Sequence, residues 1–157
     1  KKKMKRILLS SLAILLTFTF FNTLEANPKK TTCLVSGEEI SISNAESINY
    51  KGGKLYFCCP GCSSDFASNA EQYTAAANFQ LVMTNQYVQK TCPATGRKIK
   101  NMTGKKAKIV QVNGEDIALC CGGCYKKTTK MAEKKRMNYL FSAKSFKKGY
   151  VLASSQK

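Results

Sequence analysis

Two short apolar stretches in the C-terminal half of the chain predict a β-hairpin. Residues 110–112 (Val-Gln-Val) and 117–119 (Ile-Ala-Leu) are rich in strand-forming residues, and Asn113-Gly114 lies between them. An Asn-Gly pair between apolar runs is a strong signal for a two-residue turn, because both residues tolerate positive φ. We therefore expect two antiparallel strands joined at this pair.

The N-terminal half repeats this pattern and continues into a helix. Residues 55–57 (Leu-Tyr-Phe) form the second apolar stretch, and Gly52-Gly53 precedes them as the expected turn. The apolar positions that follow recur every three or four residues, which is the period of a helix; they are Cys62, Phe66, Ala70 and Tyr73. The link over residues 77–91 contains several large apolar residues, so we expect it to be packed.

The first 26 residues have the pattern of a secretory signal peptide. Five of the first six residues are basic, residues 7–21 are mostly apolar, and Ala26 is a small residue at the expected cleavage point. A helix that crosses a bilayer needs about 20 apolar residues, and this run is shorter. We expect residues 1–26 to direct export and then to be removed, with an uncleaved membrane anchor as the alternative.

The composition narrows the chemistry to thiols. The 157 residues include eight cysteines, no histidine and no tryptophan. Without histidine, a Ser-His-Asp or Cys-His catalytic set is excluded, and so is histidine ligation of a metal. Eight cysteines in a short chain indicate either a disulfide framework or a thiolate metal site.

The cysteines divide the chain into two tandem copies of one unit. Each copy has a single cysteine followed by a Cys-Cys-x-x-Cys motif, and the positions are Cys33, Cys58, Cys59, Cys62, Cys92, Cys120, Cys121 and Cys124. A glycine follows each single cysteine by four residues, Gly37 in one copy and Gly96 in the other, and supplies the backbone freedom of a tight knuckle. Agreement at so many offsets predicts a repeat.

Each copy is predicted to be a small α+β unit made of a cysteine knuckle, a β-hairpin and a helix. The first unit spans residues 33–80 and the second spans residues 92–143, with residues 144–157 as a C-terminal tail. Units of about 45 residues rarely bury enough apolar surface to fold alone, so disulfides or a metal usually stabilise them.

The spacing of the cysteines favours a metal site in each unit, with all eight cysteines as candidate ligands. The hairpin brings the knuckle cysteine close to the cysteines at the end of its second strand. Cys62 and Cys124 begin helices, whose N-termini favour thiolates. Thiolate sulfur suits Zn²⁺, and it also suits Cu(I), so the ligand type leaves zinc, copper and other soft metals open.

Two segments resemble the small metal-binding units called TRASH or YHS domains. One contains Cys33-Leu-Val-Ser-Gly37 and Phe57-Cys-Cys-Pro-Gly-Cys62, and a second, more diverged segment contains Cys92-Pro-Ala-Thr-Gly96 and Leu119-Cys-Cys-Gly-Gly-Cys124. The resemblance covers about residues 33–74 and 92–131. It implies treble-clef-like units of the kind found in proteins of heavy-metal sensing, transport and resistance. The ligands that it implies are Cys33, Cys58 and Cys62, and Cys92, Cys120 and Cys124.

Each unit lacks one cysteine of the full four-cysteine site in this family. Relatives with four cysteines carry Cys-x-x-Cys in the knuckle, and here Ser36 or Thr95 stands at the second position. Hydroxyl groups are poor zinc ligands, which leaves Cys59, Cys121, water or a partner as the fourth ligand. The second unit also has Thr128 where the first has Phe66, so we expect its core to pack differently.

Two other interpretations compete with metal binding. Four cysteines in each unit are enough for two disulfides, and export favours oxidation, which would make a disulfide-stabilised interaction protein of the cell envelope. Cys59 and Cys62, like Cys121 and Cys124, also match the Cys-x-x-Cys motif of thiol oxidoreductases. That class carries the motif in a βαβ frame, and the sequence shows no such frame.

Basic residues are concentrated in the C-terminal half. The net charge of +17 becomes +13 without residues 1–26. The Lys-rich segment over residues 126–136 is either a solvated face or a contact with another envelope protein or an anionic surface, and the signal peptide argues against nucleic acid as the partner. We predict an exported, periplasmic or secreted metal-binding protein without enzymatic activity, in a structural or metal-handling role.

Overall fold

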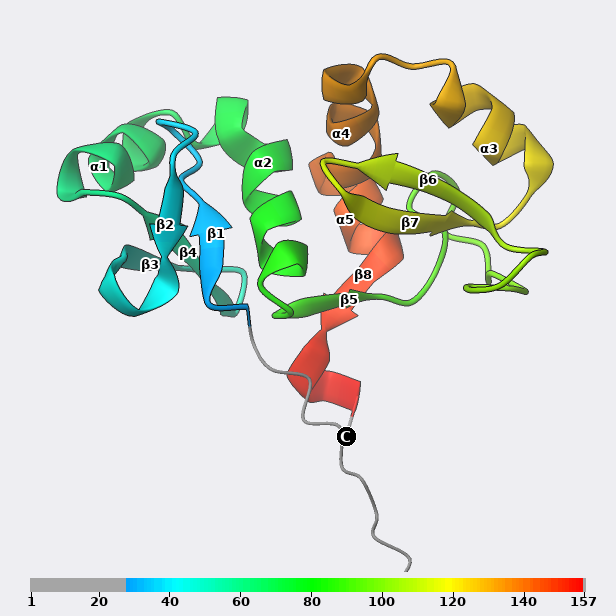
Figure 1. The fold of residues 1–157 in the computed structure, drawn as a ribbon, viewed down its shortest axis with the longest axis horizontal. Coiled ribbons are helices and arrows are strands. Elements are labelled where there is room, and N and C mark those ends of the chain that lie inside the picture. The colour runs from blue at the N-terminus through cyan, green and yellow to red at the C-terminus, as the bar shows by residue number, and fades with distance from the viewer. Residues whose placement is uncertain (1–27, 157) are drawn as a thin grey trace, which may run out of the picture.

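A computed structural model describes residues 28–156, so the predicted signal peptide over residues 1–26 lies outside the described part. Between residues 28 and 156 the chain forms five α-helices and four two-stranded antiparallel sheets (Figure 1). The predicted fold, a small α+β protein that contains two small units, is confirmed.

The first unit consists of two hairpins followed by two helices. Its elements are β1 (Lys30–Thr32), β2 (Glu39–Ser41), a short 3-10 helix (Ile42–Asn44), β3 (Glu46–Tyr50), β4 (Gly53–Phe57), α1 (Pro60–Ser68) and α2 (Ala70–Met83). The turn between β3 and β4 lies at Lys51-Gly52, with φ of 50° and 79°, and not at Gly52-Gly53 as predicted. Gly53 pairs with Tyr50 instead, so the turn has two residues of positive φ, as in a type I′ hairpin.

The helical stripe that begins at Cys62 runs through two helices instead of one. Asn69 separates α1 from α2 and adopts φ −130° and ψ 30°, which no helical residue has. Its backbone N–H donates to the carbonyl oxygens of Asp65 and Phe66 and ends α1 there. The aromatic spacing still brings Phe66 and Tyr73 together, with ring centroids 6.1 Å apart.

The second unit repeats the hairpin and the helix and then adds a longer C-terminal part. Its elements are β6 (Lys108–Val112), β7 (Glu115–Leu119), α3 (Gly122–Thr129), α4 (Glu133–Phe141), α5 (Ala143–Gly149), β8 (Tyr150–Leu152) and a 3-10 helix (Ala153–Gln156). The predicted turn is confirmed, because Asn113 and Gly114 have φ of 46° and 86° and join Val112 to Glu115.

Residues 144–156 belong to the folded molecule, in contrast to the tail that we predicted there. The strand β8 pairs with β5 (Tyr87–Gln89), which lies in the link between the two units. Phe146 and Tyr150 are almost fully buried, and their rings stack at 5.2 Å. The reason is that the apolar residues of this segment complete the core, which a Lys-rich sequence pattern conceals.

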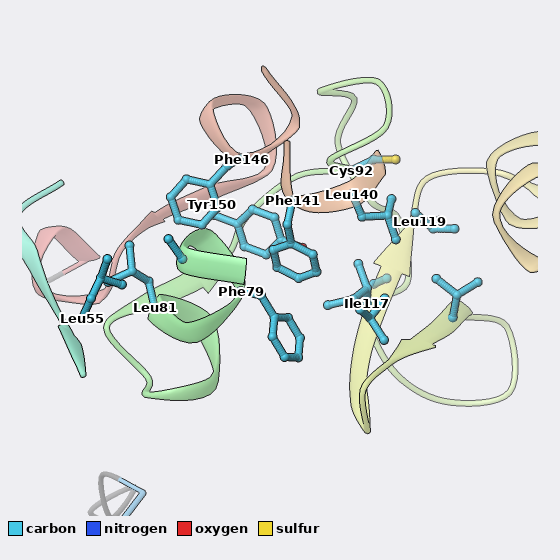
Figure 2. Close-up of a cluster of buried hydrophobic side chains, with 14 of the residues drawn as sticks. Leu55, Phe79, Leu81, Cys92, Ile117, Leu119, Leu140, Phe141, Phe146 and Tyr150 are labelled. Carbon is cyan, nitrogen blue, oxygen red and sulfur yellow. The ribbon is translucent and has the colours of Figure 1, made fainter. Parts of the chain in front are cut away.

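One core joins the two units. Helix α2 lies between the sheets of the first unit and helices α4 and α5 of the second, as Figure 1 shows. Figure 2 shows its side chain Phe79 beside Phe141, and the two rings meet edge to face at 5.0 Å. Residues 77–81 are all buried, which confirms that the link is packed.

Candidate metal centre

The structure brings six of the eight cysteines together in two triads of thiols. The Sγ atoms of Cys33, Cys58 and Cys62 all lie within 4.8 Å of one another, and those of Cys92, Cys120 and Cys124 do the same. We call these groups the first and the second triad. In both, the knuckle cysteine is buried and the other two are half-buried.

The knuckle cysteine of each triad is held by the same two backbone hydrogen bonds. In the first unit, the N–H of Cys33 donates to the carbonyl oxygen of Glu38 at 2.8 Å, and the N–H of Gly37 donates back to the oxygen of Cys33 at 3.0 Å. The chain can close this tightly because Gly37 adopts φ of 77°, where a side chain would be strained. The knuckle therefore fixes the direction of the Cys33 thiol.

The second knuckle has the same geometry although no strands flank it. The N–H of Cys92 donates to the carbonyl oxygen of Arg97 at 3.0 Å, the N–H of Gly96 donates to the oxygen of Cys92 at 2.6 Å, and Gly96 has φ of 78°. The sequence repeat thus corresponds to a structural repeat of the site itself.

The other two cysteines of each triad come from the junction between a strand and a helix. Strand β4 ends at Phe57, so Cys58 follows it directly, and Cys62 lies in the first turn of α1. Strand β7 and helix α3 place Cys120 and Cys124 in the same way. The Sγ atoms are 3.5 Å apart in the first of these pairs and 3.9 Å apart in the second.

Cys59 and Cys121 lie next to the triads and outside them. Both precede a helix in a fully extended conformation, with φ near −159° and ψ of 164°. Their thiols nevertheless remain close to the triad sulfurs. Cys59 is exposed and its Sγ is 3.9 Å from that of Cys58, while the Sγ of Cys121 is 3.5 Å from that of Cys124.

A hydroxyl group stands at the open side of each triad. The Oγ of Ser36 is 3.5 Å from the Sγ of Cys58, and the Oγ1 of Thr95 is 3.3 Å from the Sγ of Cys120. These are the positions three residues after the knuckle cysteine, where a fourth cysteine would complete the site. Each triad therefore presents three sulfurs with a neutral oxygen beside them, in addition to the nearby thiol of Cys59 or Cys121.

The first triad holds one thiol that ionises easily. Burial alone would raise the pKa of Cys33, but hydrogen bonds from Ser36 and from nearby backbone groups outweigh it and bring the pKa to about 6. The pKa of Cys62 is raised, because its hydrogen bond with the Cys58 thiol favours the protonated form and desolvation adds to this. The metal-free triad thus combines one thiolate with protonated neighbours.

The second triad also combines one thiol of lowered pKa with one of raised pKa. Burial opposes the ionisation of Cys92, yet hydrogen bonds from the backbone of Cys120 and the side chain of Thr95 lower its pKa overall. Burial raises the pKa of Cys124. Outside the triad, the backbone N–H of Cys124 at the start of α3 lowers the pKa of Cys121 to about 7.

A glutamine joins the two cysteine-bearing segments in each unit, the buried Gln80 in the first and the half-buried Gln89 in the second. In the first unit, the amide of Gln80 on α2 accepts from the backbone N–H of Tyr56 at 2.8 Å and donates to the carbonyl oxygens of Tyr56 and Thr32. Thr32 precedes the knuckle cysteine, and Tyr56 lies two residues before Cys58. Gln80 thereby ties the knuckle to the strand that ends at the triad.

Gln89 does the same in the second unit from a different element. Its amide accepts from the N–H of Ala118 at 3.0 Å and donates to the carbonyl oxygens of Ala118 and Thr91, at equivalent positions relative to the cysteines. The sequence pattern does not reveal these two glutamines, because Gln80 ends the first unit, after its cysteines, whereas Gln89 precedes the second unit. No common offset from a cysteine relates them.

The C-terminal segment supports the second knuckle. The backbone N–H groups of Lys90 and Thr91 donate to the carbonyl oxygen of Gly149. Gly149 packs so closely on Pro93 that a Cβ at this position would lie 2.8 Å from Pro93 Cα and Cβ. The second triad therefore depends on residues that the repeat pattern does not include.

The difference at Phe66 and Thr128 changes the packing as expected and leaves both helices in place. Phe66 packs against Phe57, with ring centroids 5.6 Å apart. Thr128 is fully buried, and its hydroxyl donates to the carbonyl oxygens of Cys124 and Tyr125 in its own helix. A satisfied hydroxyl costs little when buried, so the smaller residue fits without a stranded polar group.

Three converging thiols can hold a thiophilic metal ion. Sulfur atoms bonded to zinc at about 2.3 Å stand roughly 3.8 Å apart in a tetrahedron, and the distances within the triads are compatible with this spacing. The geometry of both triads therefore fits a metal ion with small side-chain adjustments. The nature of the ion stays open between zinc, copper and other soft metals.

Two more observations concern membrane-spanning helices and similarity to known proteins. Over residues 28–156, none of the helices is long and apolar enough to cross a bilayer. The chain matches no protein-family model, no curated protein and no solved structure.

Proposed function

We propose that the protein binds thiophilic metal ions, one in each triad, with Cys33, Cys58 and Cys62 as ligands in the first and Cys92, Cys120 and Cys124 in the second. The observation that carries the proposal is the convergence of three thiols at two independent places with the same local geometry. A single cluster of cysteines can arise from chance packing, but the same knuckle, strand end and helix start recur in both units.

The open fourth position favours a metal-handling role over a purely structural one. Structural zinc sites are usually closed by four protein ligands, whereas sites with three leave room for an exogenous ligand. Beside its three sulfurs, each triad has a neutral hydroxyl, from Ser36 or Thr95, and the thiol of Cys59 or Cys121, which is the other candidate for the fourth position. A bound ion would keep one exchangeable position, through which it can pass to another carrier.

We also propose that the protein handles heavy metals outside the cytoplasm. The resemblance of both cysteine segments to TRASH or YHS domains supports heavy-metal handling, and the signal-peptide pattern of residues 1–26 supports export to the periplasm or the medium. We propose binding without turnover. Disulfide bonding within each unit is the competing state, since four cysteines lie close together in each.

Protection of thiols by metal tests this proposal. The full chain is reduced, divided, and alkylated under anaerobic conditions with and without two equivalents of Zn²⁺, and mass spectrometry counts the modified cysteines. We expect all eight thiols to react without metal. With metal, six are protected, while Cys59 and Cys121 still react because they lie outside the triads.

The same experiment contains its control in the freshly isolated protein, alkylated without reduction. Free thiols or bound metal in that sample agree with metal binding. Four intact disulfides, together with no protection by Zn²⁺ or Cu(I) after reduction, would contradict the proposal and favour the disulfide-stabilised state.

A further inference from the structure

The two units share one site geometry and carry opposite charge. Residues 33–80 contain two basic and five acidic residues, a net charge of −3, whereas residues 92–143 contain twelve basic and three acidic residues, a net charge of +9. The metal site alone gives no reason for this difference, because both triads have the same ligands. The basic surface of the second unit therefore needs its own explanation.

Half of these basic residues lie in the loop before β6 and at the first residue of that strand. Residues 97–108 contain six of them and no acidic residue, in the order Arg97, Lys98, Lys100, Lys105, Lys106 and Lys108. The middle of the loop carries Met102, whose side chain is 41% exposed. Lysines thus surround an apolar side chain that points away from the core.

Helix α3 also carries an exposed apolar side chain next to lysines. Tyr125 is 39% exposed and is followed directly by Lys126 and Lys127. Within residues 28–156, Met102 and Tyr125 are the exposed large apolar side chains, and both belong to the second unit. An exposed apolar side chain among lysines is the composition of a surface that enters the interface of a membrane.

The loop and the helix emerge at the same end of the molecule. The loop ends at Lys108 and helix α3 follows Leu119, and these two residues pair with each other in the hairpin. Figure 1 shows this end of β6 and β7, with the loop and the start of α3, on the side of the second unit that faces away from the first. The segments that carry Met102 and Tyr125 therefore lie at the same end of the second unit.

The lysines of this surface carry charge that the protein does not neutralise. Among the described residues, the one ion pair joins Lys30 to Glu39, in the first unit's hairpin. Arg136 is different, because its guanidinium donates to the carbonyl oxygens of Gln111, Thr128 and Met131 and so serves the fold. Lys127 also has a partner, because its Nζ donates to the Tyr139 hydroxyl at 3.3 Å and lies 4.6 Å from the centre of that ring. The loop lysines and Lys126 remain available for an anionic partner.

We propose that this end of the second unit docks on an anionic lipid bilayer, with the lysines over the headgroups and Met102 and Tyr125 in the interface. Lysines attract anionic lipids within a Debye length, and apolar side chains add burial at the boundary. A single-stranded nucleic acid is the other anionic candidate. Such binding normally uses a series of aromatic platforms, and this surface has one exposed aromatic residue.

A tryptophan at position 102 reports the docking directly. The chain has no tryptophan, so Met102→Trp in the full chain gives a single tryptophan, which can be excited selectively over the seven tyrosines. With vesicles of phosphatidylglycerol and phosphatidylcholine we expect a blue shift of its emission. The shift should be absent with phosphatidylcholine alone and lost in 0.5 M salt, since screening shortens the range of the attraction. Ser43→Trp, at an exposed position of the first unit, is the matched control and should not shift.

Substitutions that remove lysine charge test whether vesicle binding depends on this surface or on the charge of the whole chain. In the Met102→Trp background, Lys100→Gln, Lys105→Gln and Lys106→Gln together should weaken vesicle binding at least tenfold. Lys54→Gln, Lys90→Gln and Lys144→Gln remove the same charge outside residues 92–143 and should change it less than twofold. All variants keep residues 1–27, so any contribution of that segment is the same throughout.

Three results would overturn the inference. The first is an unshifted emission of the Met102→Trp variant on anionic vesicles, and the second is an equal shift in the Ser43→Trp variant. The third is quenching of the Met102→Trp variant by a single-stranded oligonucleotide at concentrations where vesicles have no effect, which would assign the surface to nucleic acid.

Discussion

The protonation of the thiols would decide how each triad takes up the metal ion that we propose. The pKa of Cys33 is about 6, so this thiol is ionised at pH 7, whereas the pKa values of Cys58 and Cys62 are raised and both keep their protons. A metal ion binds the thiolate form only, so it must displace the remaining protons. In the metal-free triad, the buried Cys33 is therefore the thiolate that would bind an ion first.

This division predicts the proton release of the first triad. In a Cys124→Ser chain, which retains the first triad alone, we expect Zn²⁺ binding at pH 7 to release about two protons per ion. The affinity should fall as the pH is lowered, and below pH 6 the release should approach three, because Cys33 is then protonated as well.

Calorimetry in two buffers of different ionisation enthalpy measures this number. Release of fewer than one proton per ion at pH 7 would contradict the proposed protonation of Cys58 and Cys62.

At this scale, the sequence predicts thiols as the candidate ligands, and the structure gathers six of the eight into the two triads. The repeat and the absence of histidine identify thiols as the donors, and the knuckle glycines are correctly assigned. Which of two adjacent cysteines faces the site depends on where the strand ends and on the extended conformation of Cys59 and Cys121. A local pattern does not contain that backbone geometry.

At the scale of elements, Gln80 and Gln89 are the parts that hold knuckle and strand in register. Replacing Gln80 by methionine keeps the volume and removes hydrogen bonds to Tyr56 and Thr32, which leaves partly buried backbone groups without these partners. Such a loss costs about 1–3 kcal/mol. We expect Gln80→Met to destabilise the fold by this amount and to weaken metal binding at the first triad more than at the second.

Gln89→Met should instead weaken metal binding at the second triad more than at the first. Gln72→Met is the matched control, since Gln72 lies on the exposed side of α2. Denaturant unfolding measures the stability, and competition with a chelator measures the two affinities. Equal weakening of both triads by each variant would show that the glutamines act on the whole fold and not on their own sites.

The elements themselves were predictable where short-range chemistry determines them. The Asn113-Gly114 turn follows from the tolerance of both residues for positive φ. The break at Asn69 and the strand β8 were not predictable in this way. The first depends on a helix cap formed with Asp65 and Phe66, and the second depends on pairing with β5, more than 60 residues earlier in the chain.

At the scale of the molecule, a duplicated unit has become one structure with two different ends. The aromatic residues between the units, among them Phe79, Phe141 and Tyr150, belong to α2, α4 and β8, which the repeat does not relate to one another (Figure 2). A repeat predicts two similar sites, and only the tertiary structure shows that one core supports both. The charge difference then separates the ends, with an acidic first unit and a basic second unit.

Native mass spectrometry of the full chain and its cysteine variants tests the central claim most directly. After anaerobic loading with Zn²⁺, we predict two ions on the unaltered chain, one on Cys62→Ser, one on Cys124→Ser and none on the double variant. Cys59→Ser, next to the first triad, should keep two. A chain that binds no ion, or a double variant that still binds two, would contradict the claim that six cysteines form two metal-binding triads.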